Sequence, residues 1–561
     1  MKKKYLLLVL VTATFTIASF SQASLDINNI KAKINPAGDL FWDVNTGFPA
    51  FEAPKGSGLG TMFAADLWIG GVDGGGQLKT AAQTYRQSGT DFWPGPVDTQ
   101  NISISAQQMA KYNKVWKINK SSIDSFIAGW PATSSILNWP GNGDVSQNES
   151  VHLAPYFDKN GDGLYNPASG DYPLIRGDQA IFFVYNDVYA VHTQSGGTPI
   201  GLEIRGMAYS FNCATDSALA NTIFIHYEII NRSALQLNQT YIGLWADFDI
   251  GCAMSDFQGS DVNRQCFYGY NGTATDAACA GSKGYGSNLA AEAVVFLRGP
   301  SHNYPTDGAD SYGTNFQNPD GSLQLSRYMY YNNNASVTGE PTTAGQYYGY
   351  LAGNWKDGTA LTYGGTGKGG SVTADFAFPG SSDPSGKGTG FNSQATWTEA
   401  TAGNVAGDRR GIGSCGPLTM TPGSKNSFDV AFVFGRDYTA GGINKSLDVM
   451  NERVDSIRSY YAKNSTPCGE KFIASVNKIK QDAENLFLYP NPANNKLTVQ
   501  LGTVAFDYSL EIYDITGALK LKLDESRLHN QTIDIAGLSA GMYFLRATSK
   551  EQIITKRFIK Q

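Results

Sequence analysis

The chain is poor in charged residues, in histidine and in long apolar runs. Asp, Glu, Lys and Arg make up 16 % of its 561 residues, against roughly 25 % in a typical soluble domain, whereas 12 % of the residues are aromatic. Such a composition excludes an intrinsically disordered chain and a coiled coil, which are both rich in charged residues. The formal net charge of −6 disfavours binding to phosphate backbones and anionic lipid, so nucleic acid is not an expected partner.

The one extended apolar run lies at the N-terminus. Three lysines at positions 2–4 precede an apolar segment from Tyr5 to about Phe20, and Ser21-Gln22-Ala23 supplies small residues for cleavage. This order is typical of a secretory signal peptide. Threonine and serine dilute the run, so it falls short of the ~20 apolar residues that a membrane span needs. We therefore predict a cleaved signal peptide over residues 1–23, an exported body and no transmembrane span.

The cysteines and histidines do not form a zinc motif. The five histidines are scattered, and no two of the six cysteines have the spacing of a zinc knuckle or a thioredoxin motif, which disfavours a zinc site. An even number of cysteines in an exported chain permits disulfides. Cys252 with Cys266 is the preferred local bridge and Cys279 is the competing partner, because both flank an acidic loop considered below. The full set is Cys213, Cys252, Cys266, Cys279, Cys415 and Cys468.

Residues 24–480 are predicted to form a β-rich body. Short apolar segments are separated by Gly, Asn and Asp turns, and in the clearest of them Ile223, Ile225, Tyr227 and Ile229 alternate with polar residues. No repeat of about 20 to 50 residues is visible, so a propeller or a solenoid is not supported. We predict a mainly β fold, a β-sandwich with long loops and few helices, arranged as one or two lobes.

One helix with an apolar stripe is predicted over residues 446–463. Leu447, Met450, Val454, Ile457 and Tyr461 recur at steps of three and four residues, which places them on one helix face. The stripe is expected to pack on the body, and the chain then leads to a linker near residue 480.

The strongest chemical signal is the segment 158–166, Asp-Lys-Asn-Gly-Asp-Gly-Leu-Tyr-Asn. Ca²⁺ takes roughly six to eight oxygen ligands, which one loop provides from side chains at positions 1, 3, 5 and 9 and from the backbone carbonyl at position 7, with Gly at position 6. Position 12 is Ser169, so Asp171 is the nearest candidate for the closing ligand. We predict calcium here, with a metal-free turn as the alternative. The residues at positions 1, 3, 5, 7 and 9 are Asp158, Asn160, Asp162, Leu164 and Asn166.

A second acidic cluster begins with Asp247 and Asp249. Residues two apart on a strand face the same way, so these two carboxylates, with the loop residues Asp256 and Asp261, are predicted to bind a second Ca²⁺ or to stabilise a turn. Alternatively they are solvated charges, or catalytic carboxylates of a glycoside hydrolase together with Glu228. Two carboxylates that point the same way suit one cation better than two sides of a glycosidic bond.

Residues 485–561 differ in composition and are predicted to form a small separate β-sandwich. The segments Tyr489-Pro490-Asn491-Pro492-Ala493, Tyr513-Asp514-Ile515-Thr516-Gly517 and Leu538-Ser539-Ala540-Gly541-Met542-Tyr543 resemble the type A C-terminal sorting domain of type IX secretion cargo. The resemblance implies a Bacteroidetes bacterium, the type IX secretion machinery as partner, and a secreted or outer-surface location. In that family the module is commonly removed, and the cargo is released or joined to surface lipopolysaccharide.

The function of the body is predicted only in outline. Segments such as Leu67-Trp68-Ile69-Gly70-Gly71 and Gly170-Asp171-Tyr172-Pro173 resemble a family of type IX cargo, and this resemblance implies no activity. The leading hypothesis is a calcium-stabilised secreted protein with a structural or adhesive role in the envelope, more plausibly not an enzyme. The alternative is a secreted polysaccharide hydrolase or carbohydrate-binding protein in which exposed aromatic rings stack on sugars. The aromatic candidates are Trp68, Trp93, Trp139, Trp245, Trp355 and Trp397.

Overall fold

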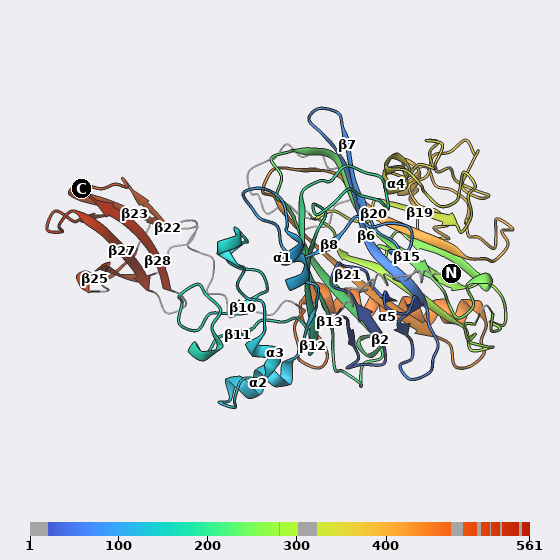
Figure 1. Ribbon diagram of the computed structural model, residues 1–561, viewed down its shortest axis with the longest axis horizontal. Coiled ribbons are helices and arrows are strands. Elements are labelled where there is room, and N and C mark those ends of the chain that lie inside the picture. The colour runs from blue at the N-terminus through green and yellow to red at the C-terminus, as the bar shows by residue number, and fades with distance from the viewer. Residues whose placement is uncertain are drawn as a thin grey trace, which may run out of the picture. The chain divides into compact units, whose positions relative to one another are not determined.

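The computed structural model describes residues 21–279, 281–300, 322–472, 486–501, 507–515, 518–527, 530–548 and 553–561. Most of the predicted signal peptide, residues 1–20, lies outside these ranges. The chain divides into two compact units, Met1–Ile473 and Ala474–Gln561, the second coloured red in Figure 1. Both are mainly β, as the sequence predicts. Within the described ranges no helix is long and apolar enough to span a membrane.

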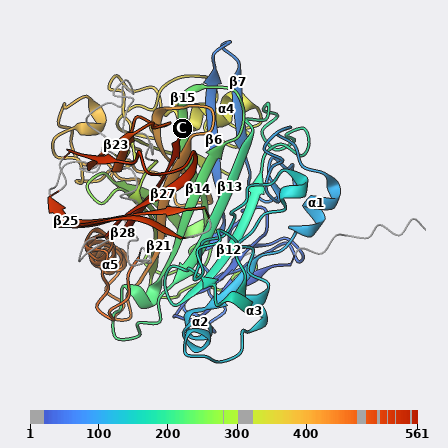
Figure 2. The same ribbon diagram turned by 90° about the vertical axis from the view of Figure 1, so that its left-hand side faces the viewer.

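The first unit is built on two antiparallel sheets. The larger has nine strands in the order β16-β17-β18-β21-β14-β13-β12-β8, with β9 also paired to β12, and Figure 2 shows β21, β14, β13 and β12 side by side. The smaller has the order β19-β20-β15-β6-β7. The nine strands of the larger sheet are β8 (Trp93–Pro94), β9 (Trp116–Asn119), β12 (Gln179–Asn186), β13 (Leu202–Ser210), β14 (Thr222–Asn231), β16 (Asp256–Asp261), β17 (Cys266–Asn271), β18 (Ala290–Arg298) and β21 (Lys425–Arg436). The five strands of the smaller sheet are β6 (Met62–Asp73), β7 (Leu78–Ala82), β15 (Leu237–Phe248), β19 (Arg327–Asn332) and β20 (Arg409–Met420).

The main core lies between these two sheets. It joins Ile225 and Tyr227 of β14 and Phe432 of β21 to Leu244 of β15 and Leu67 of β6 in one buried cluster. The alternation predicted for residues 222–231 is confirmed, because Ile223, Ile225, Tyr227 and Ile229 all belong to this cluster while Phe224 faces the opposite side of the sheet. Residues that alternate in polarity form strands here because only one face of each strand enters this core.

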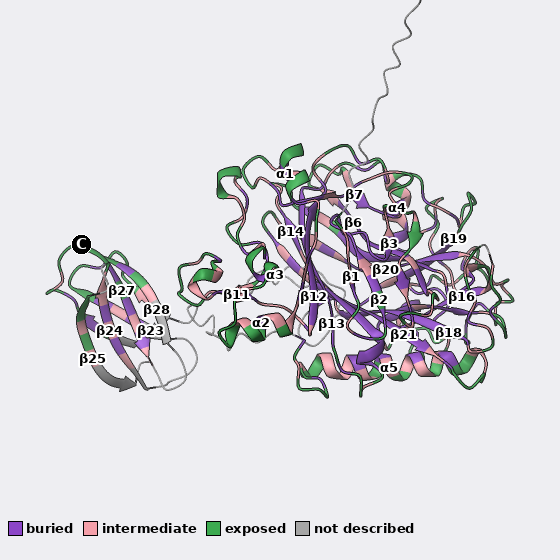
Figure 3. Cartoon of the chain, turned by 60° about the horizontal axis from the view of Figure 1, so that its bottom comes forward, coloured by how far each residue is buried: buried purple, intermediate pink, exposed green. Residues whose placement is uncertain are grey.

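The second face of the nine-stranded sheet is covered by α5 (Ile443–Lys463) and by irregular segments. Met450, Val454 and Ile457 of α5 are buried against this face, and Leu447 and Tyr461 pack against the same cluster, so the predicted apolar stripe is confirmed. Figure 3 shows α5 beside the buried strands, with exposed positions along its length. The unit therefore has three layers: a five-stranded sheet, a nine-stranded sheet, and a layer of helix and loops.

A glycine allows α5 to approach the larger sheet closely. A Cβ atom added to Gly435 of β21 would lie 2.6 Å from the Cβ and from the backbone nitrogen of Met450. We expect Gly435→Ala to lower the free energy of unfolding by about 1 to 3 kcal/mol, because overpacking must displace α5 from the sheet. The measurement is denaturant unfolding followed by circular dichroism. Gly345→Ala is the matched control, since no atom lies within 4 Å of its added Cβ and alanine is favoured by ~1 kcal/mol in a helix. Equal stability of Gly435→Ala and wild type would contradict the close packing.

Shorter elements complete the first unit. The remaining strands are β1 (Ala23–Leu25), β2 (Lys31–Ile34), β3 (Trp42–Asp43), β4 (Phe48–Pro49), β5 (Phe51–Glu52), β10 (Tyr156–Phe157) and β11 (Tyr172–Pro173). The remaining α-helices are α1 (Ala106–Lys111), α2 (Lys120–Ile127), α3 (Ser134–Leu137) and α4 (Ala344–Leu351). α4 packs on β6 and β15, where Leu351 lies against Gly70 and Gly243.

The second unit is a small sandwich of two antiparallel sheets. Their orders are β22-β23-β26 and β25-β24-β27-β28, and Leu497 and Val499 of the first pack with Ile512, Leu545 and Phe558 of the second in one core. This agrees with the strand pattern read from the sequence. The strands are β22 (Leu486–Tyr489), β23 (Lys496–Leu501), β24 (Asp507–Asp514), β25 (Leu519–Arg527), β26 (Asn530–Asp534), β27 (Gly541–Thr548) and β28 (Ile553–Lys560).

Candidate metal centres and the sorting module

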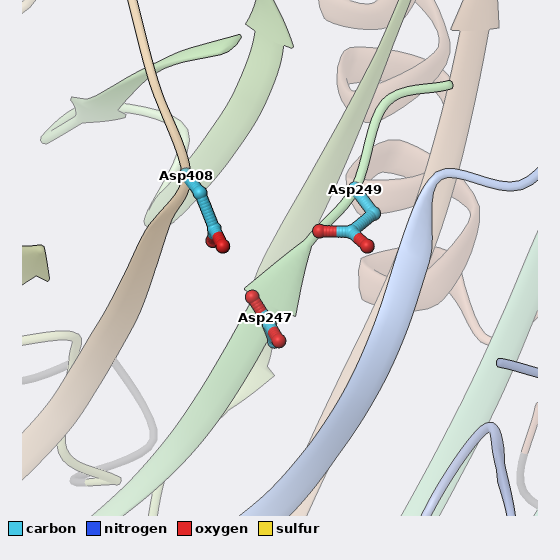
Figure 4. A group of neighbouring side chains, drawn as sticks. All are labelled: Asp247, Asp249 and Asp408. Atoms are coloured by element: carbon cyan, nitrogen blue, oxygen red, sulfur yellow. The ribbon is translucent and has the colours of Figure 1, made fainter. Parts of the chain in front are cut away.

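Three aspartates from two neighbouring strands converge at one edge of the five-stranded sheet. Asp247 lies near the end of β15 and Asp249 directly follows this strand, whereas Asp408 directly precedes β20. The antiparallel register places Asp247 opposite Arg410, which brings Asp408 to the same place. One carboxylate oxygen from each aspartate lies within 4.8 Å of those from the other two, and Figure 4 shows the three groups converging. In the part of the chain that the structure describes, no other three His, Cys, Asp or Glu residues meet this condition.

The separation of these oxygens suits one cation. Ca²⁺ binds oxygen at roughly 2.3–2.6 Å, so two ligand oxygens on opposite sides of the ion are at most about 5 Å apart. The carboxylate triad, as we call Asp247, Asp249 and Asp408, meets that limit.

Arg410 and Tyr85 hold two members of the triad in place. The Arg410 guanidinium lies 2.5 Å from Asp408 and 3.2 Å from Asp247. The Tyr85 hydroxyl donates to Oδ2 of Asp247 at 2.5 Å and accepts from Nε of Arg410 at 2.9 Å. Oδ1 of Asp247 is buried and has no hydrogen-bond partner in the part of the chain that the structure describes. An unpartnered buried carboxylate oxygen is costly, and a bound cation would satisfy it.

Negative charge exceeds positive charge at this place. Burial raises the pKa of Asp247 well above its usual range, Arg410 opposes this, and Asp249 and Asp408 add to the rise. Burial and Asp408 likewise raise the pKa of Asp249 to about 7, against the opposing effect of Arg410. A divalent cation would favour the ionised form of both groups, because a nearby positive charge lowers the pKa of a carboxyl.

The aspartate loop at residues 158–166 folds around its own side chains. Oδ1 and Oδ2 of Asp158 accept the backbone N–H groups of Gly161 and Gly163, each at 2.7 Å. Oδ1 of Asp162 accepts the N–H of Leu164 at 2.8 Å, and Gly163 adopts a φ of +78°, which glycine tolerates best. These bonds turn the side chains at positions 1 and 5 inward and leave each oxygen further lone pairs for a ligand.

Two predicted ligands of the loop have other partners. Asp171 is fully buried, and its two oxygens accept the N–H groups of Lys159 at 2.9 Å and Asn166 at 2.8 Å. Oδ1 of Asn166 accepts the N–H of Ala168 at 3.1 Å. Asp171 therefore joins the two ends of the loop. Asp158, Asn160, Asp162 and the backbone carbonyl of Leu164 remain as possible ligands, but the loop carboxylates do not form a group like the triad.

The other acidic residues named with Asp247 do not join it. Glu228 lies on β14 of the larger sheet and forms an ion pair of 2.5 Å with Lys425. Asp256 accepts the N–H of Ile250 at 2.8 Å, and Asp261 pairs with Arg264. The catalytic arrangement of Glu228 with Asp247 and Asp249 is therefore not formed.

The tryptophans proposed as sugar platforms belong to the core, with one exception. Trp68 and Trp245 have no exposed surface and stack on one another, and Trp139, Trp355 and Trp397 are buried too. Trp93 is half-buried. Burial of these large rings is the ordinary result of the hydrophobic effect.

The disulfide preferred from the sequence, Cys252 with Cys266, is wrong. Cys252 is bonded to Cys279, the competing partner, with their Cα atoms 5.4 Å apart. Cys266 is free and buried, because its position on β17 directs its side chain into the apolar cluster that contacts α5. A second disulfide joins Cys213 to Cys468, and Cys415 is free.

Sequence reasoning also missed Asp408 as a member of the triad. In the structure Arg410 bridges Asp408 and Asp247. The signal was the run Asp408-Arg409-Arg410, in which a charged segment begins a strand that is otherwise buried.

In the second unit, two of the segments that predict a sorting module contact the last strand, β28. Oδ1 of Asn491 accepts the N–H of Ile559 at 2.9 Å, and the N–H of Ala493 bonds to the Ile559 carbonyl, so the Tyr489-Pro490-Asn491-Pro492 segment is bound to the last strand. Tyr543, two residues after Gly541 on β27, stacks on Phe558 of β28. Gly517 lies outside the described residues.

Residues 487–561 match the family model described as a secretion system C-terminal sorting domain. This unit is a sorting domain. The match confirms the resemblance drawn from the sequence and supports the chain as a cargo of the type IX secretion system. The sorting domain implies secretion to the cell surface or the extracellular space through recognition by the type IX machinery.

Two further comparisons add little about the body that precedes the sorting domain. A search of curated proteins returns no match. A solved polysaccharide lyase aligns with 7 % sequence identity and a TM-score of 0.16, over 64 % of this chain and 34 % of that one. The chain thus spans about a third of the length of that protein, and agreement this low supports no conclusion about fold or activity.

Proposed function

We propose that the chain is a secreted or surface-attached protein of a Bacteroidetes bacterium whose body is stabilised by calcium and has a structural or adhesive role in the cell envelope. Export would begin with removal of the signal peptide at residues 1–23 and continue through the type IX machinery, which recognises the sorting domain. Surface lipopolysaccharide is the proposed point of attachment if the protein is retained.

The carboxylate triad is the observation that carries the calcium proposal. Among the described residues, three carboxylates meet around one point, one guanidinium faces them directly, and one buried oxygen of Asp247 finds no hydrogen-bond partner. Oxygen-rich, acidic sites of this kind suit Ca²⁺. The aspartate loop is proposed as a second and weaker site, because its ligands lie at the spacing of a calcium loop but Asp171 does not close it.

The hydrolase alternative has less support. Asp247 is 1 % exposed and is enclosed by Tyr85 and Arg410, so it does not reach a polysaccharide. A glycosidase needs two carboxyl groups on opposite sides of the scissile bond, whereas the triad points its three carboxylates at one another.

The test is thermal and denaturant unfolding of the full chain in Ca²⁺ and in EDTA, with metal content measured on the same sample. Extracellular calcium modules bind with a Kd of roughly 10⁻⁴–10⁻³ M, so Ca²⁺ at about 100 times Kd should raise the free energy of unfolding by about 3 kcal/mol. We expect Asp408→Asn to lose most of that gain and Asp162→Asn to lose less.

The control is Asp455→Asn, which removes a carboxylate that is 55 % exposed on α5 and should leave the calcium effect intact. If Asp162→Asn loses the stabilisation by Ca²⁺ and Asp408→Asn keeps it, the stabilising calcium site is the aspartate loop and not the triad. A wild-type protein that holds no calcium and melts equally in EDTA would contradict the proposal.

A further inference from the structure

A cavity of about 710 Å³ adjoins the carboxylate triad. Asp249 belongs both to the triad and to the wall of this cavity. The rest of the wall comes from β1 to β5, from the start of β6 and the segment before it, from Gly251 and from residues 281–283. Small-molecule sites typically have volumes of roughly 300–1,000 Å³ and a few polar groups on a largely apolar wall, and this cavity falls in that range.

Three lysines and three carboxylates line the cavity, and one lysine of the three is held in a direct ion pair. Lys33 is paired with Asp43 at 2.5 Å. Within the described residues, the Lys283 ammonium donates one hydrogen bond, to the carbonyl oxygen of Ser57 at 3.3 Å. Lys31 is exposed and its ammonium forms no ion pair there, although Glu52 of the same wall lies opposite it in the β2–β5 register. Two ammonium groups that lie outside ion-pair distance of a carboxylate are available to an anionic ligand.

Another part of the wall is apolar. Phe48 is 69 % exposed and lies with Pro49, Phe51 and Phe63 among the lining residues. An exposed phenylalanine in a hollow is unusual, since burial of such a ring is favourable by roughly 1.5–3 kcal/mol. Its flat face suits a ligand that has an apolar face of its own beside polar groups.

A cation on the triad would be reached from this cavity. Three carboxylates offer three to six oxygens, and Tyr85 and Arg410 already use part of Asp247 and Asp408. Ca²⁺ takes roughly six to eight oxygens. Asp247 is buried, whereas Asp249 lines the cavity, so the cavity is the side from which ligand oxygens would complete the coordination.

The Cys252–Cys279 disulfide fixes the wall that bears Lys283. Cys279 and Ser282 exchange two backbone hydrogen bonds in a tight turn, and the disulfide attaches this turn three residues after Asp249. Gly58 allows the Lys283 side chain to lie against the opposite wall, since a Cβ added there would be 2.8 Å from Nζ. The position of Lys283 relative to the triad is thus set by covalent and steric constraints.

We propose that this cavity binds a carboxylated saccharide through the triad's cation, the ammonium groups of Lys31 and Lys283, and the ring of Phe48. This inference rests on the proposed calcium centre and goes further, because it assigns the cation a binding role besides a stabilising one. A uronic acid unit carries the required chemistry: a carboxylate and hydroxyls that bind Ca²⁺ and ammonium, and a C–H face that packs on phenylalanine.

The experiment is isothermal titration of the full chain with tri-galacturonate in Ca²⁺ and in EDTA, with maltotriose as the neutral probe. We expect binding of tri-galacturonate in Ca²⁺ only, and no comparable binding of maltotriose. Phe48→Ala and Lys283→Gln should each weaken binding by at least about tenfold, which is ~1.4 kcal/mol, while the calcium-dependent rise in melting temperature is retained. Lys445→Gln, an exposed lysine of α5 outside the cavity, is the control and should bind as wild type.

The outcomes separate this inference from the proposed function. Stabilisation by Ca²⁺ without binding of tri-galacturonate overturns the inference and leaves the calcium centre standing. Binding that is equal in EDTA overturns the cation's role in it, and equal binding of maltotriose overturns the requirement for a carboxylate. If Phe48→Ala and Lys283→Gln bind tri-galacturonate with the affinity of wild type, the saccharide binds elsewhere and the inference is overturned as well.

Discussion

Removal of the Cys213–Cys468 disulfide by a double alanine substitution is expected to lower the free energy of unfolding by about 5 kcal/mol. The two cysteines are 255 residues apart in the sequence. In the chain-entropy description, a cross-link that closes a loop of this size restricts the unfolded chain strongly, and the effect grows with the logarithm of loop length. The measurement is denaturant unfolding of wild type and double variant under oxidising conditions.

The second disulfide supplies the matched control. Cys252 and Cys279 are only 27 residues apart, so their replacement should cost ~2 kcal/mol less than that of the longer bridge. Wild type kept in reductant should approach the stability of a variant that lacks both bridges. An equal cost for the two bridges, or a stability that reductant does not change, would contradict the expectation.

The position of the longer bridge explains why its loss should affect the whole first unit. Cys213 follows β13 and Cys468 follows α5, and nearby Phe472 packs on Phe211 and Phe224. The bridge therefore ties the last described residues of this unit to the face of the nine-stranded sheet that α5 covers.

Features with a local period were predictable from the sequence. The alternation in β14 and the apolar stripe on α5 are both repeats of apolar residues over a few positions of the chain. Such repeats can be seen in the sequence because one face of a strand or helix must be buried. The sorting domain was equally accessible, since its short segments occur in a fixed order over a few tens of residues.

The triad and the disulfides were less predictable because they depend on the register between distant strands. Asp408 meets Asp247 only because β15 pairs with β20 in the register that sets Asp247 opposite Arg410. A shift of that register by one residue would turn every side chain of the strand to the other face. Cys266 was misassigned for the same reason, because its strand position places it in an apolar cluster away from Cys252.

A buried ionic network around Asp429 is the second feature whose loss should lower the free energy of unfolding strongly. Asp429 of β21 accepts hydrogen bonds from Nδ1 of His226 and from the hydroxyl of Tyr461, each at 2.8 Å, and lies 3.8 Å from Arg176. It is 2 % exposed. The network therefore connects β21 to β14, to α5 and to the segment before β12. Burial alone would raise the pKa of Asp429, but His226 and Arg176 outweigh it and hold the pKa below its usual range.

Asp429→Asn is expected to lower the free energy of unfolding by about 3 to 5 kcal/mol near neutral pH, because it leaves the largely buried Arg176 guanidinium without an anion and takes the carboxylate away from His226 and Tyr461. The sign of the pH dependence follows from the lowered pKa. A carboxyl whose pKa is lower in the folded state contributes stability above its unfolded pKa of about 3.9 and loses that contribution as the pH falls toward the folded value. The part of the difference between wild type and Asp429→Asn that depends on the ionised carboxylate should thus be present above about pH 5 and narrow below about pH 4.

Tyr461→Phe is the matched control for this network. It removes one hydrogen bond to Asp429 and leaves the carboxylate, His226 and Arg176 in place, so it should cost only about 1 kcal/mol. Unfolding in urea at a series of pH values measures both variants against wild type. If Asp429→Asn is as much less stable than wild type at about pH 3 as it is near pH 7, the free energy lost comes from packing and not from charge. A contribution from charge must fall as the wild-type carboxylate takes up its proton.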